Sequence, residues 1–427
     1  MQRTFWVAWA AVVSSIIGPG VFTAIGFQAE LLESEVSILT GWLIGGFIAI
    51  AGAICYADIS NAMPAGVGEY HYVGKLFHQS AGVLSGWITL ISGFIAHAAL
   101  SAHALEAYLE PLLPVNSSIV IIGILLLLAL SHSLSQRFSG RIQFVMSAGS
   151  ILFIILFSFA VIGSTGTTEI TQLAGSFNPD ELTSASFALA LPFVYYAYTG
   201  WNASIYLVRE IPRAREVVPL SMLIGTLTVI GLYFLLNTAL LLSESQTELA
   251  GNIHSGYIAA YNMFGTTGGQ LVSVIVAFLL IASISVTIWI GSGLMTAMRQ
   301  DLSGRSSKHL PRSPHHALIF AGIAILLLLT AGFEPILYYS TLLMTLIVTV
   351  TVAGWMWRRT CRPLPGGAQS AIIFWPLAVL FIAFQLILMF TIIIEKPAVT
   401  VATLLTITVA VLFYLMRYTS FLTNSNP

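Results

Sequence analysis

The segment 14–22 reads Ser-Ser-Ile-Ile-Gly-Pro-Gly-Val-Phe and lies in the middle of the first long apolar run. Pro19 has no N–H group and its neighbouring glycines are poor helix formers, so a smooth helix cannot continue here. If one helix ends near Gly18 and another begins at Pro19, the free N–H groups of the new helix attract an anion. The unpaired carbonyls of the preceding half-helix suit an ammonium group or a metal cation. This break therefore predicts partners for both ends of an amino acid zwitterion, and a packing kink is the alternative.

A second break is predicted in the run 185–208, within the stretch Tyr198-Thr199-Gly200-Trp201-Asn202. Gly200 is a weak helix former, and the side chains of Thr199 and Asn202 can bond to nearby backbone groups. The two broken runs are the first members of two five-span halves, and an odd number of spans inverts the second half. Two breaks in matching positions predict a substrate site between them near the bilayer midplane.

The composition is that of a polytopic membrane protein built from helices. Charged residues make up 8% of the chain and hydrophobic residues 57%, whereas about a quarter of a soluble domain is charged. The first run is too long for a cleaved signal peptide, and Cys55 in a span and Cys361 in a loop do not indicate a disulfide framework. Twelve apolar runs are long enough to span a bilayer, at about 5–30, 37–62, 81–107, 116–134, 142–163, 185–208, 217–243, 268–298, 316–333, 336–357, 371–393 and 398–418.

The distribution of basic residues predicts the orientation. Every Lys and Arg except Lys396 falls on one side of a twelve-span arrangement. By the positive-inside rule that side is cytoplasmic and holds both termini. We therefore expect an integral membrane protein in a lipid bilayer, taken to be a bacterial inner membrane. The same asymmetry argues against nucleic acid as a partner.

Four motifs resemble the amino acid/polyamine/organocation superfamily of permeases, in particular the L-type and related bacterial amino acid transporters. They lie at residues 15–22, 56–70, 197–202 and 285–293, and the resemblance runs from about residue 5 to residue 300. It implies alternating access in a LeuT-like fold, with two extra helices after a five-plus-five inverted repeat. The implied units are 1–164 for the first repeat, 165–358 for the second, and 359–427 for the accessory helices.

The resemblance also implies the roles of individual residues at the two breaks. The carboxylate-binding amides fall on Gly18, Gly20 and Val21. Pro19 stands where the family usually has Ser or Thr, which removes one N–H and one hydroxyl, so we expect carboxylate recognition either to be weaker or to shift onto Gly20 and Val21. The amine-binding carbonyls fall on Ile16, Tyr196 and Thr199, the groups facing the substrate side chain are Ser15 and Tyr196, and Ala197, Tyr198 and Gly200 complete the second break.

A coupling or support site is less well defined by the sequence. Many relatives carry a Lys in the fifth span where this chain has Ser150. Either the role is vacant, as in a simple exchanger, or a small cation fills it with first-span carbonyls and the hydroxyls of Ser283 or Ser285. The alternative is that these serines bond only to their own helices. A proton or a sodium ion is the candidate coupling ion, and no cofactor or resident metal is expected.

Ionisable residues occur near the cytoplasmic surface and in the third span. Ion pairs that form only when an inner gate is shut are expected among Asp58, Glu69, Lys75 and Glu210, which stand near several arginines. In the third span, His103 and Glu106 share a helix face, and His97 is interpreted as a packed polar residue. The sequence leaves open whether His97, His103 and Glu106 take part in proton movement.

These observations favour a secondary transporter of a neutral L-amino acid or a close amine-containing analogue. Neither break contains Asp, Glu, Lys or Arg, so a charged substrate side chain would lack a counter-ion. No Walker loop, metal-ligand spacing or nucleophile elbow indicates an enzyme. The alternatives are an exchanger or exporter without ion coupling, a channel, and a nutrient sensor that has lost transport. The identity of the amino acid, the direction of transport and the oligomeric state stay open.

Overall fold

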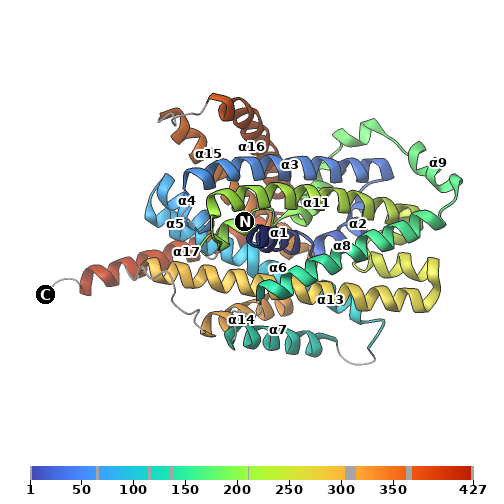
Figure 1. Cartoon of the computed structure of the whole chain (residues 1–427), viewed down its shortest axis with the longest axis horizontal. Coiled ribbons are helices and arrows are strands. Elements are labelled where there is room, and N and C mark those ends of the chain that lie inside the picture. The colour runs from blue at the N-terminus through green and yellow to red at the C-terminus, as the bar shows by residue number, and fades with distance from the viewer. Residues whose placement is uncertain are drawn as a thin grey trace.

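The computed structural model describes residues 2–63, 67–113, 117–134, 139–209, 211–302, 314–361 and 368–424, which form helices and connections but no strand (Figure 1). The first half of the chain contains α1 (Gln2–Ile16), α2 (Pro19–Leu31), α3 (Glu35–Ala62), α4 (Gly68–Leu76), α5 (Gln79–Thr89), the π-helix η1 (Leu90–Ile95), α6 (Ala96–Leu109), α7 (Ser117–Leu134), α8 (Ser139–Ser164) and α9 (Thr167–Gly175).

The second half begins with a short 3₁₀ helix and continues through the longest helices of the chain. Its elements are η2 (Pro179–Thr183), α10 (Ala185–Tyr198), the 3₁₀ helix η3 (Ala203–Leu207), α11 (Ala214–Ser243), α12 (Gln246–Leu249), α13 (Ser255–Leu302), α14 (Pro314–Thr330), α15 (Phe333–Cys361), α16 (Ala368–Glu395) and α17 (Pro397–Asn424).

Eight segments of the described chain are long and apolar enough to cross a membrane. They are Thr4–Leu31, Glu35–Ala62, Gln79–Leu109, Phe144–Ser164, Ala214–Ser243, Ser255–Gln300, Phe333–Cys361 and Phe374–Glu395. Three further apolar helices are shorter, at Ser117–Ser133, His315–Thr330 and Pro397–Leu412. The expectation of an all-helical polytopic protein is thus confirmed at this coarser level.

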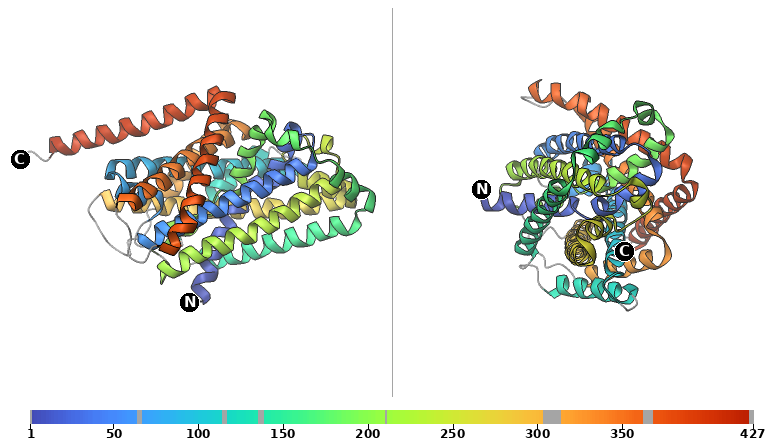
Figure 2. Two further views of the ribbon diagram at one scale, coloured as in Figure 1. Left: turned by 90° about the horizontal axis from the view of Figure 1, so that it is seen from above. Right: turned by 90° about the vertical axis from the view of Figure 1, so that its right-hand side faces the viewer.

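The long helices lie side by side along the long axis of the molecule. Helices α4 and α5 lie at one end of the bundle and α9 lies at the other (Figure 1). Helix α17 leaves the bundle, so that the C-terminal end of the chain stands away from the remaining helices (Figure 2). The end that carries α4 and α5 is called the α4 end below.

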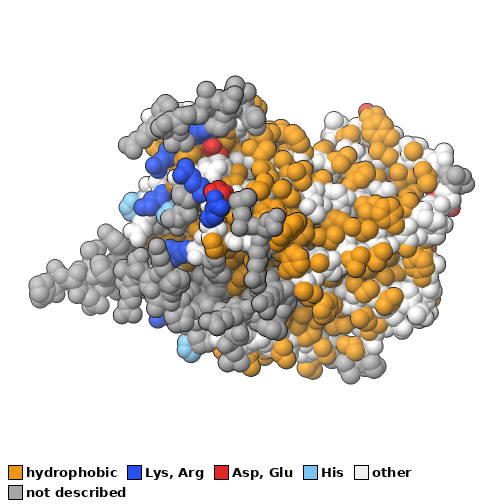
Figure 3. Space-filling view, in the orientation of Figure 1, with side chains coloured by type: hydrophobic (Ala, Val, Ile, Leu, Met, Phe, Trp, Pro, Cys, Tyr) orange, Lys and Arg blue, Asp and Glu red, His pale blue; other side chains and the backbone are white. Residues whose placement is uncertain are grey.

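Hydrophobic side chains cover most of the visible sides of the bundle, whereas Lys and Arg side chains gather at the α4 end (Figure 3). Large apolar residues are exposed on many helices, for example Leu127 on α7 at 66% and Phe390 on α16 at 68%. A continuous apolar surface of this extent suits contact with lipid rather than water. The bundle is therefore that of an integral membrane protein.

Both helix breaks lie where the local sequence places them. Helix α1 ends at Ile16 and α2 begins with Pro19 at its first position, and Gly18 between them is extended. Helix α10 ends at Tyr198 and the chain resumes as η3 at Ala203. The first break lies in the segment Thr4–Leu31, and 94% of an apolar 18-residue stretch of this segment is buried. Other helices therefore cover the unwound backbone.

Substitution at Gly26 on α2 tests how closely this helix must pack. A Cβ atom added there would lie 2.1 Å from the carbonyl oxygen of Asn252, so the backbone would have to move. We expect Gly26→Val to lower the thermal midpoint of the detergent-purified protein by several degrees, since overpacking costs about 1–3 kcal/mol. Gly149→Ala on α8 is the control, because a Cβ added there meets nothing within 4 Å. An equal midpoint for both variants would contradict the close packing of α2.

Candidate functional site

The two helix breaks lie directly against each other. Gly200, with φ at 106°, packs on the backbone of Ser15, where an added Cβ atom would lie 2.4 Å from the Ser15 carbonyl oxygen. Gly20 packs on Ala197, whose Cα atom would lie 2.5 Å from a Cβ added at Gly20. Any side chain at either glycine would push the two interrupted helices apart. Glycine at these two positions therefore allows backbone to approach backbone.

Tyr233 on α11 joins the two interrupted helices through its hydroxyl group. Its oxygen lies 2.6 Å from the carbonyl oxygen of Ile16 and 3.1 Å from that of Ala197. The single hydroxyl hydrogen can be donated to either carbonyl or shared between them. The ring is fully buried and packs edge to face with Trp42 at 5.4 Å. One hydroxyl on a neighbouring helix thus supports the carbonyl ends of both half-helices.

The expected backbone partners of a zwitterion are partly engaged within the protein. The Tyr196 carbonyl accepts hydrogen bonds from the Thr199 backbone N–H at 3.0 Å and from the Thr199 hydroxyl at 2.6 Å. The Ile16 carbonyl has Tyr233 as its donor. The N–H groups of Gly20 and Val21 lie in the first turn of α2, where a helix offers no internal acceptor. The half of the break that we expect to bind an anion is thus the half whose N–H groups have no acceptor within the helix.

A cavity of about 30 Å³ lies beside the two breaks. A water molecule requires roughly 10–15 Å³ measured in the same way, so the cavity has room for a few waters and is too small for an amino acid. The buried Ser15 hydroxyl in its wall has no hydrogen-bond partner among the residues that the structure describes. The cavity is lined by Ser15, Thr89, Ser92, Gly93, Phe94, His97, Tyr196, Thr199, Gly200, Asn202, Ala203, Tyr206, Thr287, Ile290, Ser340 and Met344.

His97 on α6 belongs to this cavity. Its Nδ1 atom lies 3.1 Å from the Tyr196 hydroxyl and its Nε2 atom lies 3.1 Å from the Ser283 hydroxyl on α13. A Cβ atom added to Gly18 would lie 2.8 Å from the same Nε2 atom. The imidazole therefore lies against the first break and bonds to the helix that carries the second. The sequence feature that could have placed His97 at this cavity is the presence of an ionisable residue within a membrane span.

Aromatic rings close the side of the breaks away from the α4 end. Phe27 on α2 stacks on Phe193 of α10 with ring centroids 4.9 Å apart, and on Phe333 of α15 at 5.6 Å. Phe193 also packs edge to face with Tyr338 at 5.2 Å. These contacts join the two interrupted helices to α15, so an opening on this side would require the stack to separate.

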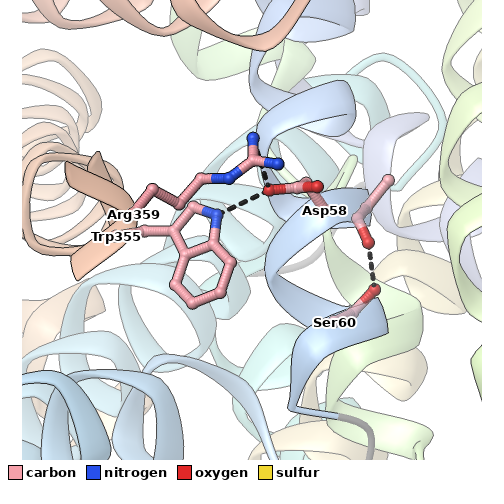
Figure 4. A network of polar contacts seen from close by, with 5 residues as sticks. Asp58, Ser60, Trp355 and Arg359 are labelled. Atoms are coloured by element: carbon pink, nitrogen blue, oxygen red, sulfur yellow. Dashed lines mark hydrogen bonds and ion pairs between the residues drawn. The ribbon is translucent and has the colours of Figure 1, made fainter. Parts of the chain in front are cut away.

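At the α4 end, an ion pair links α3 to α15 (Figure 4). The Asp58 Oδ2 atom lies 3.2 Å from the Arg359 guanidinium and accepts a hydrogen bond from the Trp355 indole at 2.7 Å. Arg359 also lies over the Phe374 ring at 4.7 Å. Of the other expected gate residues, Lys75 accepts a hydrogen bond from Arg358 through its backbone carbonyl at 3.3 Å, and Glu210 lies outside the described residues.

Glu69 is fully buried at the start of α4 and is held by neutral donors. Its Oε1 atom accepts a hydrogen bond from the Asn202 amide at 2.7 Å, and its Oε2 atom accepts one from the Tyr206 hydroxyl. Burial raises the pKa of Glu69 above its ordinary value, and its hydrogen bonds partly oppose that shift. Asn202 and Tyr206 also line the cavity, so Glu69 links α4 to the unwound end of α10.

The three serines proposed as a coupling or support site bond to different partners. Ser150 bonds to the Met146 carbonyl of its own helix at 3.0 Å, and Ser285 bonds to His132 at 2.8 Å. Ser283 lies against Gly18 beside His97, and it alone of the three lies at the break. The hydroxyl of α8 that bonds to α1 belongs to Ser147, which donates to the Ala10 carbonyl at 2.9 Å. In the part of the chain that the structure describes, no three His, Cys, Asp or Glu residues cluster as metal ligands would.

The other ionisable residues of the third span lie away from the cavity. His103 bonds through Nε2 to the Ala331 carbonyl at 2.9 Å. Glu106 accepts hydrogen bonds from Ser118 at 2.5 Å and Ser117 at 3.3 Å on α7. His103 thus bonds to the connection between α14 and α15, Glu106 bonds to α7, and neither residue lines the cavity.

Comparison with known proteins shows transporter relatives over most of the chain. The human large neutral amino acids transporter small subunit 2 is 27% identical over 404 residues, which cover 89% of this chain and 74% of that protein. The Asc-type amino acid transporter 1 of Mus musculus is 26% identical over 92% of this chain and 76% of its own length. The serine/threonine exchanger SteT of Bacillus subtilis is 27% identical over 62% of this chain and 61% of its own length.

A solved structure and a family model agree with these relatives. The chain superposes on a Na⁺-coupled sialic acid symporter, described in a substrate-bound outward-open state, with a TM-score of 0.63. The two share 16% identity, and the match covers 91% of this chain and 88% of the symporter, which shows a shared fold. The family model for amino acid permeases matches residues 4–415. This chain therefore belongs to the amino acid permease family, and it is an integral membrane transporter rather than an enzyme.

Proposed function

We propose that this permease is a secondary active transporter that carries a neutral L-amino acid, or a close amine-containing analogue, by alternating access. The observation that carries this proposal is the contact between the two helix breaks, in which Gly200 packs on the Ser15 backbone. Two unwound segments at one place offer N–H groups and carbonyls to a small dipolar solute. The names of the relatives, which include large neutral amino acids and a serine/threonine exchanger, support the class of substrate.

The proposed arrangement has twelve spans in a five-plus-five inverted repeat followed by two helices. The three shorter apolar helices and the interrupted α10 would complete the eight long segments. The repeats would occupy 1–164 and 165–358, with 359–427 as accessory helices. Because Lys and Arg side chains gather at the α4 end, we place that end and both termini in the cytoplasm, in a bacterial inner membrane.

The substrate would bind with its carboxylate on the free amides of Gly20 and Val21 and its amine near the carbonyl ends of α1 and α10. Among the described residues that line the cavity, none is Asp, Glu, Lys or Arg. A substrate side chain with a net charge would therefore be buried without a counter-ion, which is unfavourable. This lining favours a neutral side chain.

Alternating access is supported by closures of different kinds on the two sides of the cavity. The Phe27 stack closes the side away from the α4 end, and Asp58, Arg359 and Glu69 make polar links at the α4 end. The small cavity requires the helices to separate before an amino acid can enter. Opening one set of contacts while the other stays closed would expose the site to one side at a time.

The experiment that tests this function is counterflow in proteoliposomes. Proteoliposomes that contain the purified protein would be loaded with unlabelled amino acid. Their uptake of labelled L-leucine, L-serine, L-lysine and L-glutamate would then be compared. A carrier of neutral amino acids shows saturable trans-stimulated uptake of L-leucine or L-serine. Flux that is linear in concentration would indicate a channel, and binding without flux would indicate a sensor.

The Ser15 side chain provides a conservative test of the site. Its hydroxyl is buried in the cavity wall and has no partner in the described part of the chain, so a bound substrate can supply the missing hydrogen bond. We expect Ser15→Ala to raise the KM for counterflow about 3- to 10-fold, which corresponds to one hydrogen bond of about 0.5–1.5 kcal/mol. Ser164→Ala, at an exposed hydroxyl that bonds only to its own helix, is the control. An unchanged KM for Ser15→Ala would remove this hydroxyl from the substrate site.

The pair Asp58–Arg359 tests the polar closure at the α4 end. Asp58→Asn or Arg359→Gln alone would leave a partly buried charge without its partner, whereas the double variant removes both charges. We expect each single variant to lower both the thermal midpoint and the counterflow rate, and the double variant to recover part of each loss. A double-mutant cycle on both quantities measures the coupling. Purely additive losses would show that the ion pair does not hold the two helices together.

A further inference from the structure

His97 is placed where a bound substrate carboxylate would meet it. The π-helix η1 ends at Ile95, two residues before His97, and π-segments in helices are frequent at functional sites. The Nε2 atom of His97 lies against Gly18, whose neighbours in α2 present the free amides of the break. A carboxylate on those amides would lie beside the imidazole.

The hydrogen-bond partners of His97 suit both protonation states of the ring. Each ring nitrogen lies 3.1 Å from a hydroxyl oxygen, of Tyr196 on one side and of Ser283 on the other. A hydroxyl group can donate or accept, so the two partners can satisfy the neutral ring or the doubly protonated ring in one position. Ser101 donates to Ser283 at 3.4 Å and can adjust with it. Proton binding would therefore require hydroxyl rotation rather than movement of the helices.

The groups that face His97 supply no negative charge of their own. From α10 it faces Tyr196, and from α13 it faces Ser283. The interrupted α1–α2 segment contributes the backbone of Gly18. In the cavity wall that the structure describes, the remaining polar residues carry hydroxyl or amide groups, namely Ser15, Thr89, Ser92, Thr199, Asn202, Tyr206, Thr287 and Ser340.

The titratable groups nearest to His97, in the sequence or around the cavity, form hydrogen bonds with residues other than His97. His103 and Glu106, on the same helix, bond to the Ala331 carbonyl and to serines of α7. Glu69 reaches the cavity wall only through Asn202 and Tyr206. An imidazolium at His97 is thus buried without a facing anion until a substrate carboxylate arrives, and a nearby carboxylate stabilises the protonated ring.

We propose that His97 is a proton-binding site, which takes up a proton as the substrate carboxylate binds and releases it when the carboxylate leaves. The proton comes from solution on one side, binds to the imidazole nitrogen that carries no proton in the neutral ring, and returns to solution on the other side. Histidine suits this exchange because its ordinary titration range lies near physiological pH. The proposal rests on the proposed amino acid transport, and it makes the proton rather than sodium the coupling ion.

The experiment compares two rates in the same sodium-free proteoliposomes, with the membrane potential clamped. The first is counterflow of L-leucine or L-serine, whichever is faster, and the second is uptake of the same amino acid driven by an inward proton gradient. At one proton per substrate, one pH unit supports about tenfold accumulation. We expect the gradient to drive accumulation by the wild type, and His97→Gln to lose accumulation while it keeps measurable counterflow. His103→Gln is the matched control and should accumulate as the wild type does.

A measurement on the wild type keeps the test independent of whether the variants fold. Purified protein in a weakly buffered solution with a pH indicator should take up protons when L-leucine or L-serine is added. Absent proton uptake, or accumulation that His97→Gln retains, would overturn the proposal. If Glu69→Gln abolishes accumulation while His97→Gln retains it, the proton binds at Glu69 instead. A wild type without counterflow would refute the proposed transport itself, which separates the two failures.

Discussion

Every backbone N–H and C=O group inside a bilayer needs a partner, and this constraint governs the whole bundle. The two helix breaks free several such groups at one place. Unwound backbone of this kind survives at membrane depth only where protein or water covers it. The segment that contains the first break is accordingly the most buried of the eight long apolar segments, and Tyr233 supports the carbonyls of both half-helices. The remaining helices therefore cover the polar backbone groups of the break.

Close backbone packing leaves little space beside the two breaks. Gly20 and Gly200 bring the interrupted helices together, and the space left beside them is about 30 Å³. In the proposed function, an amino acid could occupy this space only if these helices separated from their neighbours. The contacts that must yield differ on the two sides. The Phe27 stack is apolar and depends on area and geometry, whereas the Asp58–Arg359 pair is electrostatic and depends on the surrounding dielectric.

Two buried titratable groups, Glu69 and His97, have neutral hydrogen-bond partners, whereas Asp58 at the α4 end is paired with the charged Arg359. Glu69 is held by an amide and a phenol, and His97 by a phenol and an alcohol. Neutral partners tolerate either protonation state at modest cost, whereas an ion pair requires both charges to be present. This difference is consistent with the proposed roles, in which His97 changes its protonation state and the Asp58–Arg359 pair keeps both charges.

The sequence by itself determined the features that depend on neighbouring residues. Pro19 lacks an N–H group and Gly200 disfavours a helix, so both breaks could be placed to within a residue or two. The lengths of the apolar runs likewise indicated an all-helical membrane protein. The positions of Ser15, Gly18 and Gly20 at a break followed from the same local pattern.

Only the tertiary structure decided which side chains meet across helices, because helix rotation and packing bring together residues far apart in the chain. It paired Asp58 with Arg359, and it turned Ser147 rather than Ser150 toward α1. It also surrounded Glu69 with neutral donors and brought His97 against Gly18. Each of these contacts joins helices whose relative rotation is set by the packing of the whole bundle, and no local pattern encodes that rotation.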